Sequence, residues 1–382
     1  MSSADSEAEM AAPIRYSYAP FLTSENNIVV LVGAGASHDL GIPMGEKLSE
    51  AVAELVPRSI ESSSSTHPQA AALWQLLRSR IADNDLEKWL TELAGLRDST
   101  SIISGVTAGG ASLVVSSSMP MMSGGGSNAP VLREAPFLFK CVCAATRDVI
   151  QGAVQDDREF RTRAGELYRS LVEDVMRHNG GGRFLIFTTN YDNAIDAFAD
   201  SEAPHCAFVD GFTSGDTQRW DPRIFGRPSG PKCIFQMKLH GSVNFYRDQK
   251  GSVFKVSRSP VTSIELKAGD EGLLYPTQTK AISADPYTVY YGYLGESLRY
   301  ARRFISIGYS YGDDHLRAQV VNALRTNGRD IRALVVGEFK KGNPFDGYGD
   351  RITILSPRTH PFSRGDTGQP LRDEVKKFLE GV

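Results

Sequence analysis

Polar side chains that could do chemistry follow four apolar runs of this 382-residue chain. Asn190 and Asp192 come directly after the run FLIFT, and His240 comes directly after IFQMKL. The small residues 33–37 and the polar stretch 308–315 follow IVVLV and FISI in the same way. A histidine can take a proton near neutral pH, and small residues let backbone N–H groups approach an anion. Together these stretches indicate a site that binds an anionic ligand and moves a proton.

The elements that must position these residues are strands that alternate with helices. Apolar runs predict strands within RFLIFTTNYD, CIFQMKLHGSVNFY, RRFISIGYS, DIRALVVGEF and RITILS, in addition to IVVLV. This alternation predicts an α/β fold with a Rossmann-like, doubly wound and mainly parallel sheet. Ligands of such sheets bind at the carboxyl ends of the strands, so we expect the four polar stretches to meet there.

A long helical stretch interrupts this pattern after the first strand and turn. Apolar residues at helical spacing, among them Trp74 and Trp89, predict a helical insertion over 46–180. We therefore expect a polar N-terminal segment over 1–26 and a Rossmann domain built from 27–45 and 181–382. Within the insertion, 103–130 is rich in Ser and Gly. This composition predicts a mobile loop that is dispensable for folding.

Composition and charge exclude several classes of protein. The net charge of −3 provides no overall attraction to nucleic acid or to an anionic membrane. The polar start of the chain lacks a signal peptide, and no apolar run could cross a bilayer, so we expect a cytoplasmic protein. The four cysteines form no C-x-x-C pair, which argues against a four-cysteine zinc site. We expect buried, reduced thiols and no metal.

Taken in order, these motifs resemble those of the sirtuin family. The turn after the first strand lacks the third glycine of the G-x-G-x-x-G dinucleotide fingerprint and has His38 there instead. The resemblance is carried by GAGAS with GIP at 41–43, TTNYD at 188–192, KLHG at 238–241, IGYSYGDDH at 307–315 and VVGEF at 335–339. It covers 27 to about 340, apart from the helical insertion.

The resemblance implies that NAD binds as the substrate and assigns a role to each matching residue. It implies that Asn190 orders the ribose and a water, that Asp192 contacts the nicotinamide carboxamide, and that His240 takes the proton. His315 or Asp313 would be the next candidate for the base. The residues it places around NAD are Gly33, Ala34, Gly35, Ala36, Ser37, Thr189, Asn190, Asp192, Gly308, Tyr309, Ser310, Gly337 and Glu338. Since a side chain at Gly35 would fill the pyrophosphate's space, we expect Gly35→Val to abolish NAD binding and to leave the fold largely intact.

Departures from the family pattern suggest which branch this chain resembles. The protein deacylases have D-F-R after G-I-P, where this chain has 44–46 as Met-Gly-Glu. The four-cysteine zinc module and the peptide-binding F-G-E-x-L-P segment are also missing, and 244–256 is predicted to form a hairpin instead. Water then becomes the expected acceptor. The chain resembles the NAD-hydrolysing sirtuin-like proteins of bacterial anti-phage defence, and most of all the sirtuin-like partner of HerA-type ATPases.

That branch implies a homo-oligomer, a hexameric HerA-type ATPase as partner, and contact with nucleic acid only through such an assembly. Three alternatives to the NAD hydrolase stay open: a non-catalytic sensor of NAD or ADP-ribose, an NAD-dependent protein deacylase, and a nuclease role of the assembly. Release of nicotinamide and ADP-ribose from NAD would favour the hydrolase. A requirement for an acylated peptide would favour the deacylase, and tight binding without turnover would favour the sensor.

Overall fold

The structure is a computed structural model that describes most of the chain between Ile28 and Gly381. The described ranges are 28–81, 85–107, 133–153, 157–179, 182–202, 206–226, 230–247, 252–256, 271–273, 285–326, 331–339 and 341–381.

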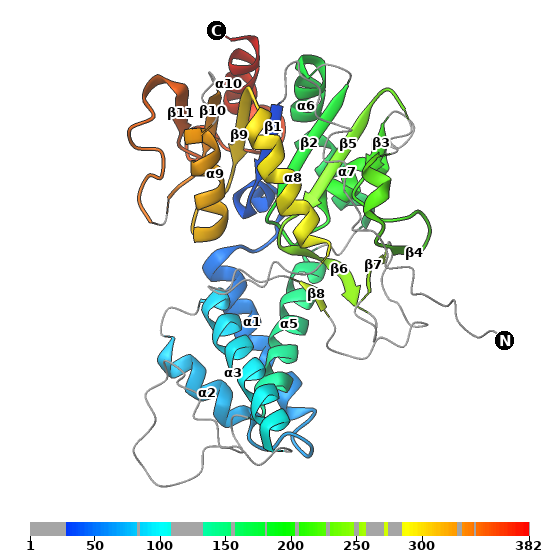
Figure 1. The fold of residues 1–382 in the computed structure, drawn as a ribbon, viewed down its shortest axis with the longest axis vertical. Coiled ribbons are helices and arrows are strands. Elements are labelled where there is room, and N and C mark those ends of the chain that lie inside the picture. The colour runs from blue at the N-terminus through cyan, green and yellow to red at the C-terminus, as the bar shows by residue number, and fades with distance from the viewer. Residues whose placement is uncertain are drawn as a thin grey trace, which may run out of the picture.

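A seven-stranded sheet, parallel throughout, forms the centre of the molecule (Figure 1). Its order is β11-β10-β9-β1-β2-β5-β3, and each neighbouring pair is parallel. The strands are β1 (Ile28–Val32), β2 (Arg183–Thr188), β3 (Ala207–Val209), β5 (Cys233–Lys238), β9 (Arg303–Ile307), β10 (Arg332–Val336) and β11 (Ile352–Leu355). The predicted α/β class with a mainly parallel sheet is confirmed.

Helices cover both faces of this sheet, and the alternation of side chains along β1 explains why. Ile28, Val30 and Val32 pack into the core formed with α6 (Asp157–His178), α7 (Ala194–Glu202) and α10 (Gln369–Glu380). Val29 and Leu31 point the opposite way, into the core formed with α8 (Tyr287–Tyr300) and α9 (Asp314–Thr326). A strand buried on both faces must be apolar at every position, as IVVLV is. The sheet is therefore doubly wound, as predicted.

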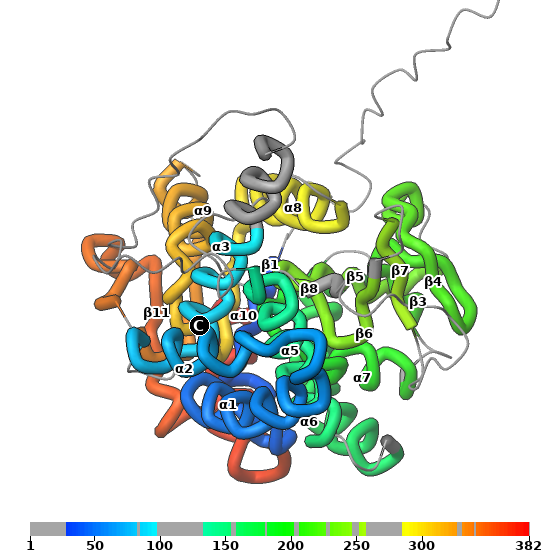
Figure 2. The backbone as a smooth tube through the Cα atoms, turned by 90° about the horizontal axis from the view of Figure 1, so that it is seen from below, coloured from blue at the N-terminus to red at the C-terminus, as the bar shows by residue number. Residues whose placement is uncertain are grey.

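A helical module lies beyond the carboxyl edge of the sheet (Figures 1 and 2). It consists of α1 (Gly45–Glu61), α2 (Ala70–Arg80), α3 (Leu86–Thr107) and α5 (Ala135–Gly152). The indole rings of Trp74 and Trp89 meet edge to face at 5.0 Å in its core, and Cys141 and Cys143 are buried in α5.

Two details of the predicted insertion differ from the structure. Helix α3 continues to Thr107, so the first residues of the predicted loop 103–130 are helical, and 108–130 lies outside the described residues. Helix α6, which we placed in the insertion, packs on β2, α7 and α10 and so covers the sheet. Its buried residues Phe160 and Leu167 belong to the same apolar core as Ile186 of β2 and Phe198 of α7.

A small antiparallel sheet extends from the end of β5. Its order is β4-β7-β6-β8, with β4 (Thr217–Arg219), β6 (Gly241–Arg247), β7 (Val253–Val256) and β8 (Glu271–Leu273). The antiparallel pairing of β6 with β7 confirms the hairpin predicted over 244–256. Short 3-10 turns lie at Ala34–Leu40, Pro222–Gly226, Gly349–Arg351 and Gly365–Gly368. None of the described helices is long and apolar enough to cross a membrane.

The order of the strands locates the crevice in which a ligand would bind. From β1 the chain adds β2, β5 and β3 on one side of the sheet, and later β9, β10 and β11 on the other. The order therefore reverses between β1 and β9. In open α/β sheets this switch point, at the carboxyl ends of the strands, is where ligands bind.

Candidate functional site

The turns that follow β1 and β9 interlock through glycines at the switch point. The N–H of Gly33 donates to the carbonyl oxygen of Ile307, and that of Gly35 donates to the carbonyl oxygen of Gly308, both at 2.9 Å. A Cβ at Gly35 would lie 2.8 Å from Cα of Gly308. A Cβ at Gly308 would collide with the amide nitrogen of Ala36, and Gly308 has a φ of +68°. These glycines are needed to pack one turn against the other.

This packing corrects the expectation that Gly35→Val would leave the fold largely intact. Any side chain at Gly35 must displace the backbone of the β9 turn. The N–H of Ala36 is also engaged, donating to the carbonyl oxygen of Gly33 at 2.9 Å. Of the five residues of the β1 turn that were predicted to lie around NAD, Ala34 and Gly35 are exposed, whereas Gly33, Ala36 and Ser37 are buried. An anion bound here would therefore meet the exposed part of the loop at Ala34 and Gly35.

Three predicted site residues meet in one buried hydrogen-bonded group. Nδ2 of Asn190 donates to Oγ of Ser37 at 2.9 Å, and that hydroxyl donates to Oδ2 of Asp192 at 2.8 Å. The other carboxylate oxygen, Oδ1 of Asp192, accepts the N–H of Ala194 at 2.9 Å and so caps the start of α7. These bonds join the β1 turn to the β2 turn. The proposed contact of Asp192 with a carboxamide stays a prediction, because both of its oxygens are engaged within the protein here.

The side-chain oxygen of Asn190 is the strongest indication of a ligand. The backbone N–H of Asn190 donates to Oγ1 of Thr188 at 3.0 Å, which holds the residue in place. Asn190 is only 6% exposed, yet its Oδ1 has no hydrogen-bond partner in the part of the chain that the structure describes. A buried acceptor left without a partner costs about 1–3 kcal/mol. A ligand or water that donates a hydrogen bond to Oδ1 would recover this free energy.

The register of β2 and β5 brings the segments that carry Asn190 and His240 to the same edge of the sheet. Thr188 pairs with Lys238 across the two parallel strands, and each of the two candidate residues stands two positions further along the chain. His240 is buried, and its Nε2 lies 3.1 Å from Oδ2 of Asp313. The imidazole and the carboxylate thus form a buried pair at the carboxyl edge of the sheet.

Asp313 belongs to the last turn that completes this edge. Its Oδ1 accepts the N–H of His315 at 3.0 Å and caps α9, while its Oδ2 holds the imidazole. His315 itself is exposed, and its ring packs edge to face on Tyr291 at 5.3 Å. Of the two alternative bases named from the sequence, Asp313 is therefore a partner of His240, and His315 lies at the surface.

The remaining predicted residues lie at the carboxyl ends of β2, β9 and β10. Thr189 is half-buried, and its N–H donates to the carbonyl oxygen of Val32 at 3.0 Å. Tyr309 is buried. Its burial, and to a smaller extent the charge of Asp313, raise the pKa of its hydroxyl far above 10.0.

The residues after β10 lie close to the β9 turn or at the surface. A Cβ at Gly337 would lie 2.8 Å from the carbonyl oxygen of Tyr309. Glu338 is exposed and pairs with Arg358 at 3.0 Å. Ser310 is half-buried beside Tyr309.

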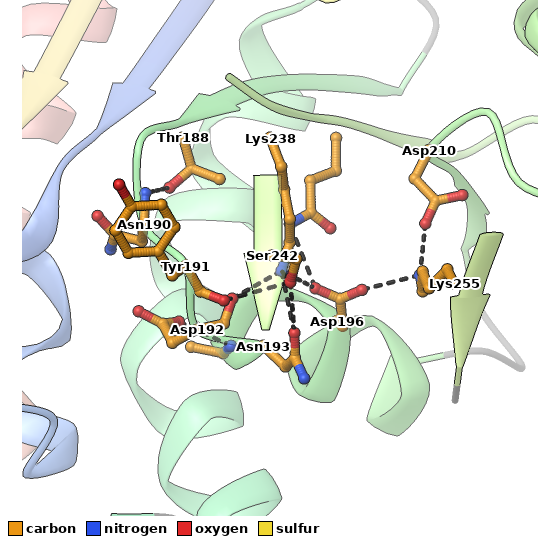
Figure 3. A network of polar contacts seen from close by, with 12 residues as sticks. Thr188, Asn190, Tyr191, Asp192, Asn193, Asp196, Asp210, Lys238, Ser242 and Lys255 are labelled. Atoms are coloured by element: carbon orange, nitrogen blue, oxygen red, sulfur yellow. Dashed lines mark hydrogen bonds and ion pairs between the residues drawn. The ribbon is translucent and has the colours of Figure 1, made fainter. Parts of the chain in front are cut away.

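A buried ionic network that sequence reasoning missed lies next to the site (Figure 3). It consists of Lys238, Asp196, Lys255 and Asp210. Nζ of Lys238 lies 3.0 Å from Oδ2 of Asp196, Nζ of Lys255 lies 2.9 Å from the other carboxylate oxygen, and Lys255 also pairs with Asp210. Burial by itself would raise the pKa of Asp196, but Lys238 and Lys255 outweigh it and hold that pKa well below 3.8. The lysine at the end of the apolar run CIFQMK was the feature of the sequence that could have indicated this network.

In the described part of the chain, no group of three His, Cys, Asp or Glu side chains is arranged to hold a metal ion.

The comparison with family models agrees with the resemblance seen in the motifs. Residues 185–343 match the family model of the SIR2-like domain. This span contains Asn190, His240 and the β9 turn, and it begins after the β1 turn. A solved structure described as "Structure of Sir2Tm bound to a propionylated peptide" is similar at 11% identity and a TM-score of 0.37, covering 93% of this chain and 92% of that chain. No curated protein sequence matches the chain.

Proposed function

We propose that this protein hydrolyses NAD to nicotinamide and ADP-ribose at the carboxyl edge of its parallel sheet. The observation that carries the proposal is the unpartnered, buried Oδ1 of Asn190, at the same carboxyl edge of the sheet as the buried pair of His240 and Asp313. This placement lies next to the switch point, within a span that matches the SIR2-like domain. A site with a hydrogen-bond acceptor and a proton acceptor suits the activation of water beside a ribose.

The reaction requires one bond to form and one to break. The oxygen of a water molecule attacks the anomeric carbon of the nicotinamide ribose, and the bond from that carbon to the pyridinium nitrogen breaks. Nicotinamide leaves with the electron pair and becomes neutral. Asn190 orients the ribose and the water through its side-chain amide, and His240 takes the proton that the water loses. Asp313 holds the imidazole and stabilises the positive charge that the ring gains.

Water is the proposed acceptor because the segment after His240 forms a hairpin. Strand β6 begins at Gly241, directly after the histidine, and pairs with β7 within the small sheet. A protein deacylase would have to add a peptide strand at this site. The motif-level resemblance supports a role in anti-phage defence, a homo-oligomer and a HerA-type ATPase as partner, through which nucleic acid would be contacted.

A non-catalytic sensor of NAD or ADP-ribose is the second candidate. It is favoured by the engagement of backbone N–H groups of the phosphate loop within the protein: those of Gly33, Gly35 and Ala36 donate to carbonyl oxygens. Such a loop binds an anion after rearrangement, which is how a sensor changes conformation on binding.

One experiment separates these functions. The purified chain is incubated with NAD, with and without an acylated peptide, and nicotinamide and ADP-ribose are quantified by chromatography. We expect both products at equal amounts without peptide, formed about 10²- to 10⁴-fold more slowly by the His240→Ala variant. Turnover that needs the peptide would establish a deacylase. Binding of NAD without products would establish the sensor.

A further inference from the structure

Lys238 makes contacts that a purely structural ion pair does not need. Besides Asp196, its ammonium donates to the carbonyl oxygen of Asp192 at 2.6 Å, to Oδ1 of Asn193 at 3.1 Å and to Oγ of Ser242 at 2.7 Å. Lys238 is only 3% exposed. Figure 3 shows the ammonium among these groups, with Asp196 between Lys238 and Lys255.

These contacts join the two turns that carry the candidate catalytic residues. Asp192 and Asn193 belong to the β2 turn, which starts with Asn190. Ser242 belongs to the segment after β5, and its hydroxyl also lies 2.9 Å from Oδ1 of Asn193. The N–H of Val243 adds a backbone bond of 2.9 Å to the carbonyl oxygen of Tyr191. The buried ammonium, the Ser242 hydroxyl and this backbone bond therefore hold the two segments against each other.

His240 stands between the two residues that anchor its segment. Lys238 precedes it by two positions and Ser242 follows it by two, and the two side chains contact each other. With both neighbours held on the β2 turn, the backbone of His240 has little freedom to shift relative to Asn190. The ring of Tyr191, from that same turn, lies 6.3 Å from the imidazole ring.

Lys255 provides a natural comparison. It is also buried and also pairs with Asp196, but its second ion pair is with Asp210, which directly follows β3. The backbone of Asp210 also accepts a hydrogen bond from the hydroxyl of Tyr290 at 2.8 Å, so this half of the network binds β7 and α8 to the sheet. The two lysines thus share one aspartate, and only Lys238 contacts the catalytic turns.

We propose that Lys238 is a positioning residue for NAD hydrolysis: its ammonium, with Ser242, sets the placement of His240 relative to Asn190. This inference rests on the proposed function and names a residue for which no direct contact with substrate is required. Because a misplacement of about 1 Å can cost about 10²-fold in rate, a loss of this contact acts on kcat rather than on binding.

The test compares Lys238→Met with Lys255→Met. Each variant removes one of the two ammonium groups around Asp196 and replaces it with an uncharged chain of similar length. We measure the unfolding midpoint, kcat and KM for NAD, and the affinity for carba-NAD, an analogue whose nicotinamide bond resists hydrolysis. Both variants should unfold at a lower temperature, since each leaves a buried carboxylate with one cation fewer. We expect Lys238→Met to lower kcat by about 10- to 100-fold and to leave carba-NAD affinity nearly unchanged. Lys255→Met should keep kcat.

A third variant, Ser242→Ala, keeps the proposal testable if Lys238→Met does not fold. It removes only a hydroxyl, and we expect kcat to fall while KM and carba-NAD affinity stay near those of the wild type. Equal kcat values for Lys238→Met and Lys255→Met, or an unchanged kcat for Ser242→Ala, would overturn the positioning role and leave the proposed function intact. A wild-type protein that binds carba-NAD without hydrolysing NAD, or that does neither, would overturn the hydrolase and this inference together.

Discussion

The imidazole of His240 and the carboxylate of Asp313 lie with Nε2 and Oδ2 3.1 Å apart, although 73 positions separate them in the chain. Both side chains are more than nine-tenths buried. A buried carboxylate in this position fixes the ring orientation and stabilises the protonated ring. The pair therefore has the two parts that the proposed general base requires, a proton acceptor and a group that holds it.

Asp313→Asn should reduce NAD turnover without unfolding the protein. The amide oxygen can still cap α9 by accepting the N–H of His315, whereas the charge that stabilises the protonated His240 is lost. We expect kcat to fall by about 10²- to 10⁴-fold, the range of a positioned general base. The matched control is Asp314→Asn, one residue further on, because Asp314 is exposed and forms a surface ion pair with Lys341. Unchanged turnover in Asp313→Asn would exclude the pair from the reaction.

Asn190→Ala and His240→Ala should each lower turnover by about 10²- to 10⁴-fold, or about 3–5 kcal/mol of barrier. The double variant should be scarcely slower than the worse single one, because the two groups act on one transition state. Affinity for carba-NAD should change much less than kcat. If the two losses instead add in full, the residues act in separate steps.

Gly35→Ala should destabilise the protein by about 1–3 kcal/mol, the usual cost of overpacking, because its Cβ would lie 2.8 Å from Cα of Gly308. Gly152→Ala is the control. It lies at the end of α5, and a Cβ there meets no atom within 4 Å, so this variant should keep or slightly raise the free energy of unfolding. Chemical denaturation measures the free energy of unfolding of the two variants and tests this difference. Equal stability would mean that the β1 and β9 turns separate at little cost.

Stability should fall steeply in acid through Asp196. Because the lysines lower the pKa of this carboxyl below its ordinary 3.8, its contribution is present at neutral pH and is lost as the pH falls below about 4. In base, Lys255 behaves in the opposite way. Burial by itself would lower the pKa of Lys255, but Asp196 and Asp210 together raise it above 10.5. Its contribution is therefore lost only in strong base. Urea unfolding as a function of pH tests this, and Asp196→Asn should flatten the acid limb. An unchanged acid limb would contradict the assignment.

Tyr309→Phe should weaken ligand binding without lowering stability. The Tyr309 hydroxyl is buried without a hydrogen-bond partner among the described residues, so its removal breaks no bond in the protein. We expect carba-NAD affinity to fall by about three- to tenfold, the worth of one hydrogen bond. Tyr290→Phe is the matched control, since its hydroxyl donates to the backbone of Asp210. It should destabilise the protein by about 0.5–1.5 kcal/mol and leave affinity unchanged. The reverse pattern would remove Tyr309 from the site.

The sequence by itself determined the class of the fold and the residues that face the ligand edge. Runs such as IVVLV are apolar at every position, which only a strand covered on both faces requires. Because such strands run parallel, the residues that follow them gather at one edge, and this predicted that Asn190 and His240 lie at the same edge of the sheet. Local patterns of this kind depend only on neighbours in the chain.

Tertiary structure decided what depends on segments far apart in the chain. The order of strands around β1 brings Gly35 against Gly308, so that these glycines serve close packing of two turns. It also brings Asp313 to His240, and Asp196 to both Lys238 and Lys255. A charge in an apolar run shows that a partner must exist, because burial without one is too costly. Which residue is the partner depends on how the elements pack. The spacing of residues in the sequence does not determine this packing.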